Sequence, residues 1–125
     1  MGGINVLPSK ALSDVVVTDV AVFILPGGDR WETTAVEAEL ERLLKQLDAA
    51  NVPIAAICAA TVAISRVGLL RGRRHTSNGL EYLRSHVPGY SEAGHYVDAP
   101  AVRDRKLITA SGLADVEFAR ELMEE

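Results

Sequence analysis

The feature that most constrains the fold is the alternation of short apolar runs with segments of helical spacing. Residues 19–29, DVAVFILPGGD, are rich in β-branched side chains and end at Pro-Gly-Gly, as a buried strand before a tight loop does. Residues 52–57, VPIAAI, form a second such run. Strands of this kind belong to parallel sheets with both faces covered. We therefore predict an α/β fold with a doubly wound, mostly parallel sheet sandwiched by helices.

Helical spacing fills the interval between these two runs. Thr34 and Glu37 have the spacing of a capping box, and Asn51 can close the C-terminus of the helix. Shorter helices are expected over residues 59–70 and 80–87. A last helix is expected at the C-terminus, with one apolar face made by Val116, Ala119, Leu122 and Met123.

The remaining strands are expected in the second half of the chain. Residues 73–78, RRHTSN, read as a third strand that ends at the Asn78-Gly79 turn signal, and residues 94–112 supply two or three strands around Pro100 and a DRK turn. We find no repeat, low-complexity tract or linker. The sequence therefore predicts a single domain over residues 1–125.

Composition narrows the class of protein. The chain has 125 residues, 48% hydrophobic and 24% charged, with a net charge of −4, which fits one globular core. The basic run at residues 71–74 is too short for a nucleic-acid stripe, and we find neither a membrane span nor a signal peptide. We expect no nucleic-acid or membrane partner and a cytoplasmic location, where a single cysteine stays reduced.

That cysteine, Cys58, is the main candidate for chemistry. It follows the strand run at 52–57 and precedes a predicted helix, at the carboxyl edge where open α/β sheets bind ligands. Small residues flank it in the segment AICAA, as in the nucleophile elbow, where the chain turns sharply from strand to helix. A helix N-terminus also stabilises a thiolate. The alternative is that Cys58 is a small residue of the core.

Partners for such a nucleophile are less clearly marked. Gly27 and Gly28 end the neighbouring strand, where their N–H groups can face the same cleft as oxyanion donors, although Pro-Gly-Gly is also an ordinary turn. The candidate bases are His75, preferred because its strand follows the elbow helix, and also His86 and His95. The carboxylates that could assist them are Glu32, Glu81, Glu92 and Asp98. The histidine spacing fits no metal site, and we expect no metal or cofactor.

Four segments, in order, resemble the ThiJ/PfpI superfamily, whose fold is that of the class I glutamine amidotransferases. They are FILPGGDRWE, IAAICAATVAISRVGLLRGRRHTSN, YVDAPAVRD and LITASGLADVEFARELM. The similarity is strongest to a bacterial branch described as intracellular proteases or amidotransferase-like proteins. It implies a flavodoxin-like sheet and covers nearly the whole chain.

The resemblance assigns roles to individual residues. Cys58 matches the nucleophilic or oxidisable cysteine, Gly27 and Gly28 match the Pro-Gly-Gly loop, and the Ala59 N–H matches the second oxyanion donor. The protease branch has histidine where this chain has Ala59. Other members have a catalytic histidine at the position of Asn78, three residues after His75.

The same resemblance suggests that the chain lacks part of the family domain. Relatives have a strand, a helix and another strand before the segment MGGINVLPSK, so Met1 matches an internal position. The missing part includes a central strand and the glutamate that hydrogen-bonds the cysteine. Glu32 follows the Pro-Gly-Gly loop and does not match that glutamate.

Three functions remain open from the sequence. The first is a cysteine-dependent hydrolase or amidase acting on a small amide, a glycated adduct or a peptide. The second is a redox-sensing or stress-response protein in which Cys58 is reversibly oxidised. The third is an inactive truncated paralogue. Because an unpaired sheet edge needs cover, we also expect a homodimer.

Overall fold

The computed structural model describes residues 3–124, so Met1 lies outside the described residues. Its centre is a four-stranded sheet in the order β1-β2-β4-β3. The strands are β1 (Phe23–Leu25), β2 (Ile54–Ile57), β3 (Ala101–Asp104) and β4 (Leu107–Ala110). β1 and β4 both run parallel to β2, and only β3 is antiparallel to its neighbour. The predicted mostly parallel sheet is confirmed.

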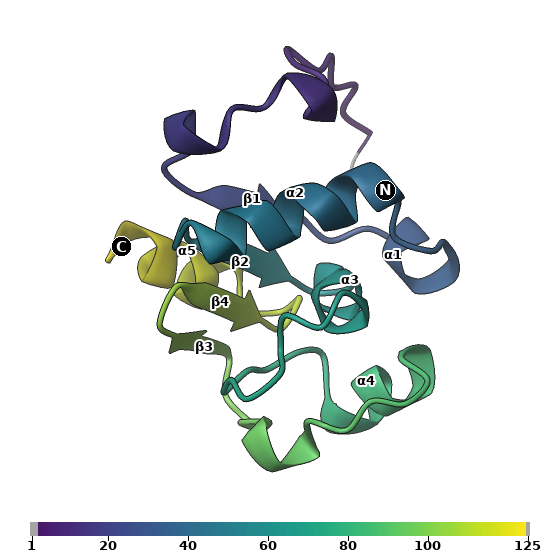
Figure 1. Cartoon of the computed structure of the whole chain (residues 1–125). Helices are drawn as coiled ribbons and strands as arrows, with labels where there is room; N and C mark the ends of the chain where they lie inside the picture. Colours follow the sequence, from purple (N-terminus) through teal and green to yellow (C-terminus); the bar gives the residue numbers. More distant parts are fainter. Residues whose placement is uncertain (1–2, 125) are drawn as a thin grey trace.

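Helices connect the strands and cover the sheet (Figure 1). They are α1 (Arg30–Thr33), α2 (Ala38–Ala49), α3 (Ala60–Arg66), α4 (Leu80–His86) and α5 (Asp115–Met123). Short 3₁₀ turns lie at η1 (Leu12–Asp14), η2 (Val17–Asp19) and η3 (Ala93–His95). In the described part of the chain, no helix has the length and apolar character needed to cross a lipid bilayer.

Alternate residues of β2 explain why both faces of the sheet are covered. Ile54 and Ala56 join the larger core, which includes Leu44 and Leu47 of α2. Ala55 points to the opposite face and packs in a smaller core with Phe118 of α5. Successive side chains of a strand point to opposite faces, so a strand buried on both sides reads as a continuous apolar run. The doubly wound arrangement is thereby confirmed.

The capping box predicted for the long helix is wrong. Thr34 ends α1 instead, and the chain stays extended to Glu37, which precedes α2 without a side-chain capping bond. The short turn of α1 uses the residues just before Thr34, so α2 begins later than the pattern indicated. The C-terminal prediction holds, because Asn51 has φ 58°, the left-handed conformation that often ends a helix.

Two other elements differ from expectation. The third strand is reduced to one bridge between His75 and Tyr96, because neighbouring groups bind elsewhere; the Thr76 N–H, for example, donates to Thr109 Oγ1 at 2.9 Å. The predicted apolar face of α5 is correct only at Leu122, which packs against the smaller core, since Val116 is 64% exposed and Met123 is exposed too. One turn before Leu122, the helix presents Phe118 to the same core.

Candidate functional site

Cys58 occupies a strained turn between β2 and α3. Its φ is 61°, a left-handed conformation that costs a non-glycine residue about 1–2 kcal/mol. The Cys58 N–H donates to the Ala110 carbonyl of β4 at 3.0 Å, while the Thr61 N–H donates to the Cys58 carbonyl at 3.1 Å. Thr61 Oγ1 donates to that carbonyl as well, at 2.7 Å. Bonds to the sheet and to the helix therefore hold the strained residue in place.

Two glycines make room for the Cys58 side chain. A Cβ built on Gly27, in the loop after β1, would lie 2.9 Å from Cys58 Cβ. A Cβ built on Gly112, just after β4, would lie 2.7 Å from Cys58 Sγ. Both distances are shorter than carbon and sulfur atoms tolerate, so each position requires glycine. Sequence reasoning selected Gly27 but missed Gly112, although the Ser-Gly pair after β4 resembles the Pro-Gly-Gly signal after β1.

Asn78 contacts the sulfur directly. Its Nδ2 donates to Cys58 Sγ at 3.4 Å, and its Oδ1 accepts the Gly112 N–H at 2.8 Å. The backbone donor at Gly112 settles which end of the amide faces the sulfur, because only the amide oxygen can accept it. The structure thus brings Asn78, Gly27 and Cys58 together.

Two backbone N–H groups near the elbow have no hydrogen-bond acceptor within the described residues. Ala59 is the residue that precedes α3, and Gly28 lies in the loop after β1. Within residues 3–124, no acceptor is bonded to the N–H of either residue. Donors of this kind can stabilise an oxyanion that forms on a group bound to Cys58.

The structure does not bring His75, the preferred candidate base, to Cys58. His75 is fully buried, its Nδ1 donates to the Arg73 carbonyl at 2.7 Å, and its Nε2 contacts Tyr90 Oη at 2.6 Å. Burial lowers the pKa of His75, although the bond to Arg73 opposes this effect. With both nitrogens used inside the fold, His75 is a structural residue here and has no nitrogen left to accept a proton from the thiol.

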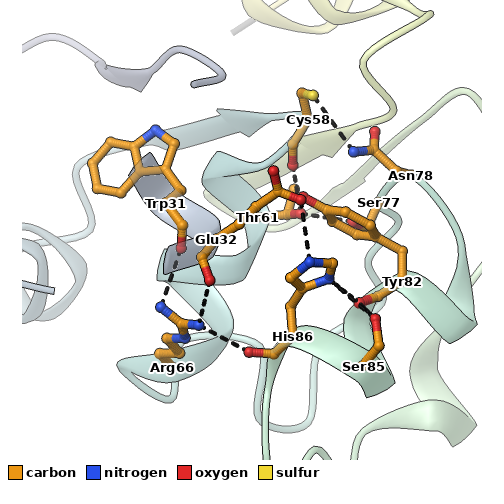
Figure 2. A network of polar contacts seen from close by, with 10 residues as sticks. All are labelled: Trp31, Glu32, Cys58, Thr61, Arg66, Ser77, Asn78, Tyr82, Ser85 and His86. Atoms are coloured by element: carbon orange, nitrogen blue, oxygen red, sulfur yellow. Dashed lines mark hydrogen bonds and ion pairs between the residues drawn. The ribbon is translucent and has the colours of Figure 1, made fainter. Parts of the chain in front are cut away.

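Another histidine lies in the polar network around Cys58 (Figure 2). His86 Nε2, at the end of α4, lies 3.2 Å from Glu32 Oε2 of α1. His86 Nδ1 also contacts the Tyr82 carbonyl at 2.9 Å. The Ser85 hydroxyl lies 3.1 Å from the same Nδ1, so both ring nitrogens of His86 have partners within the fold. The sequence named Glu32 and His86 separately, but no spacing indicated that they pair.

Arg66 holds these two elements in register. From the end of α3, its guanidinium donates to the carbonyls of Trp31, Glu32 and Thr34 around α1. It also donates to the His86 carbonyl at 2.9 Å. One side chain thus joins α1 to α4 through their backbones. Sequence reasoning missed this role, since a guanidinium that binds backbone carbonyls leaves no pattern in the partner residues.

Tyr82 lies between the Glu32–His86 pair and the Cys58–Asn78 pair. Burial raises the pKa of Tyr82 most strongly, followed by the Glu32 carboxylate, and the negative charge of a Cys58 thiolate adds to the effect. The Asn78 amide opposes the shift. These causes identify Glu32, Asn78 and Cys58 as the polar surroundings of the Tyr82 hydroxyl. No sequence pattern had selected Tyr82.

The other candidate side chains are paired elsewhere. Glu81 binds Arg84 at 2.5 Å on α4, and Glu92 binds His95 at 3.1 Å beside η3. Asp98 lines a pocket of about 350 Å³ that Asn78 also lines. In the described residues, no group of three or more histidine, cysteine, aspartate or glutamate side chains could hold a metal ion.

A second pocket lies on the Gly27 side of the elbow. It has a volume of about 420 Å³ and is lined by Gly27 and Gly28, by Trp31 of α1 and by apolar residues such as Val36 and Leu40. The Trp31 Nε1–H donates to the Pro26 carbonyl at 2.9 Å, which keeps the indole beside the loop. Gly27 and Asn78, which both contact Cys58, thus each line a different pocket, and carboxylates are present in both.

Comparison with known proteins agrees with this geometry. The model of the DJ-1/PfpI family matches residues 1–125. The uncharacterized protease YoaZ of Bacillus subtilis is 36% identical over 125 residues, which are 100% of this chain and 59% of that protein. A thiJ/pfpI family protein from Bacillus anthracis has a TM-score of 0.89 at 36% identity, covering 99% of this chain and 58% of that one.

A DJ-1 superfamily protein from Agrobacterium tumefaciens, Atu0886, gives a TM-score of 0.87 at 35% identity, covering 98% of this chain and 65% of that one. The chain thus spans less than two thirds of the length of the relatives it matches. Family model, sequence and fold agree along the whole length of the chain, and the resemblance inferred from its motifs is confirmed. The chain belongs to the DJ-1/PfpI family.

Proposed function

We propose that this chain is a cysteine-dependent hydrolase or amidase in which Cys58 is the nucleophile. The observation that carries the proposal is the left-handed Cys58 at the strand-to-helix turn, with Asn78 Nδ2 donating to its sulfur. A residue is held in such a conformation at a cost, and strain of this kind clusters at functional sites. Two similar proteins, YoaZ and YdeA of Bacillus subtilis, are each named an uncharacterized protease, which supports the same class of reaction.

The proposed reaction proceeds through a thioester. The Cys58 thiolate attacks the carbonyl carbon of an amide, and the carbonyl oxygen becomes an oxyanion that the N–H groups of Ala59 and Gly28 stabilise. The C–N bond then breaks, and the amine leaves with the proton that the thiol has lost. Water hydrolyses the thioester, which releases the carboxylic acid and restores the thiol. A small amide, a glycated adduct or a peptide meets these requirements.

An acyl-transfer probe tests this proposal. Incubation with p-nitrophenyl acetate at pH 7 should release a burst of nitrophenol, and mass spectrometry should find one acetyl group on Cys58. The acetylation rate should exceed that of free cysteine by about 10-fold or more, because an activated thiol is ionised to a greater extent. The Cys58→Ala variant should show no burst. Acetylation no faster than that of free cysteine, or acetyl groups on lysines alone, would reject the proposal.

Reversible oxidation of Cys58 is the second candidate function. The single thiol is partly exposed, and the donors that would face an oxyanion would equally bind the oxygens of a sulfenic or sulfinic acid. In the first step, peroxide transfers one oxygen to sulfur and leaves as water. Met123, 83% exposed, is an internal competitor for the same oxidant. Oxidation of Met123 before Cys58 by mild peroxide would exclude a sensing role.

A further inference from the structure

The hydroxyl of Tyr82 is a buried polar group that the fold leaves unsatisfied. Its oxygen is shielded from solvent and forms no hydrogen bond with any residue of the described chain. Glu32 and Asn78 are close enough to alter the ionisation of Tyr82, but neither meets the distance and angle of a formed hydrogen bond. Buried hydroxyls are nearly always bonded, so an exception beside a reactive residue calls for a functional explanation.

The neighbours of Tyr82 indicate which of them would accept a hydrogen bond from its hydroxyl and which would donate one. The Glu32 carboxylate raises the pKa of Tyr82, as an acceptor of the hydroxyl proton does. The Asn78 amide lowers that pKa, as a donor to the same oxygen does. Asn78 Nδ2 has two N–H groups, and one of them already points to Cys58 Sγ. The other is free to donate to Tyr82.

Glu32, at one end of this series of hydrogen bonds, is firmly held. Its carboxylate pairs with His86 Nε2 at 3.2 Å, and both side chains are more than two-thirds shielded from solvent. Arg66 donates to the backbone carbonyls of both Glu32 and His86. Figure 2 shows the side chains of Glu32, Tyr82, Asn78 and Cys58 gathered in one region above α4. The acceptor that would orient the Tyr82 hydroxyl is therefore fixed by two independent contacts.

We propose that Glu32, supported by His86, orients the Tyr82 hydroxyl, and that Tyr82 in turn fixes the Asn78 amide against the sulfur of Cys58. Tyr82, Glu32 and His86 are then positioning residues that act through Asn78. This inference rests on the proposed function only for the use of the Cys58 thiolate as a nucleophile. Both bonds would form if the hydroxyl turned toward these two groups, which already affect its ionisation. Glu32 would then support Cys58 from within the described residues, through Tyr82 and Asn78.

Alkylation of Cys58 by iodoacetamide measures the effect without a substrate. Tyr82→Phe removes the hydroxyl that is proposed to fix the Asn78 amide, so we expect the alkylation rate at pH 7 to fall about 10-fold, the equivalent of about one hydrogen bond to a charged group. At pH 10, where thiols are ionised in any case, the rates of variant and parent should converge. A merely structural effect would lower the rate at both pH values.

A double-mutant cycle tests whether Tyr82 acts through Asn78. Asn78→Ala should lower the rate at pH 7 at least as much as Tyr82→Phe, and the double variant should be no slower than Asn78→Ala alone. Glu32→Gln, which keeps an acceptor oxygen, should retain more of the rate than Glu32→Ala. Fully additive effects of Tyr82 and Asn78, or an unchanged rate in Tyr82→Phe, would overturn the inference.

Tyr90→Phe is the matched control. Tyr90 has a buried hydroxyl too, but that hydroxyl binds His75 Nε2 at 2.6 Å, in a contact that does not involve Cys58. Its loss should lower stability and leave alkylation at pH 7 unchanged, whereas Tyr82→Phe should leave stability unchanged or raised. The acetylation burst with p-nitrophenyl acetate is a separate measurement, which tests the proposed function. If the burst fails while the cycle shows coupling, the proposed function fails and the positioning chain stands; a burst without coupling gives the opposite result.

Discussion

Gly112 and Cys58 approach each other so closely that a Cβ on Gly112 would lie 2.7 Å from the Cys58 sulfur. The contact joins the end of β4 to the turn after β2, and the Gly112 N–H also orients Asn78. The space around the thiol is therefore set by backbone from two strands.

Gly112→Ala should displace the Cys58 side chain and slow its alkylation by iodoacetamide at least 10-fold. Overpacking of this kind costs about 1–3 kcal/mol, so the midpoint of urea unfolding should fall as well. The control is Gly94→Ala, where the added methyl group meets nothing within 4 Å. A Gly112→Ala protein with the parent's alkylation rate would show that the thiol does not need this space.

Replacing Cys58 measures the strain stored at the elbow. Cys58→Gly should be at least as stable as Cys58→Ala, because glycine adopts φ 61° without penalty while alanine keeps a cost of about 1 kcal/mol. Ala60→Gly, in the first turn of α3, should show the opposite sign and lose about 1 kcal/mol. Urea unfolding of the variants provides the comparison, and a Cys58→Gly protein clearly less stable than Cys58→Ala would contradict the assignment of strain.

Arg66→Lys should destabilise the protein by about 2–3 kcal/mol, because one ammonium group cannot serve carbonyls on both α1 and α4. The alkylation rate of Cys58 should fall at the same time if α1 and α4 support the site. Arg42→Lys is the surface control, since Arg42 makes only an exposed contact with Glu39 and its replacement should change stability by less than about 0.5 kcal/mol. Equal effects of the two variants in urea unfolding would refute a special role for Arg66.

His75 should make the protein less stable in mild acid. Burial lowers its pKa in the folded state, so the unfolded chain binds the proton more readily. The contribution of His75 is complete above the unfolded value, about 6.5, and is lost as the pH falls through that value toward the lower folded pKa. Urea unfolding from pH 8 to pH 5 should show this loss, and His75→Gln should remove part of the slope. His95→Gln should keep most of it, because His95 is the smallest of the causes that shift the pKa of His75.

The outer edge of β1 should support self-association. In the described residues, β1 pairs with β2 alone, and Ile24 is 47% exposed on that strand. Such edges tend to pair with a second chain, and a lysine at the edge discourages this. Sedimentation velocity should show a concentration-dependent dimer that Ile24→Lys weakens and the exposed helix variant Gln46→Lys does not. A monodisperse monomer at high concentration would reject the expected homodimer.

Local sequence determined the parallel strands, most of the helices and the position of Cys58 between β2 and α3. Apolar β-branched runs and helical spacing identified the parallel sheet and its covering helices, because burial on both faces leaves a continuous apolar pattern. Small residues around Cys58 indicated the elbow, since only small side chains fit where a strand turns sharply into a helix. Gly27 was selected for the same site from the end of its predicted strand, and Asn78 was selected through the family resemblance; the structure brings both to Cys58.

Tertiary structure alone decided which histidine and which carboxylate lie in the polar network near Cys58. His75 lies closer to the elbow in the chain than His86 does, yet the buried bridge to Tyr96 directs its ring to Tyr90. Glu32 and His86 come from helices far apart in sequence and meet because Arg66 binds both backbones. Hydrogen bonds to backbone carbonyls carry no side-chain signature, so no reading of residue types could have found them. The sequence by itself thus determined where Cys58 lies in the fold, and only long-range packing decided which polar groups gather near it.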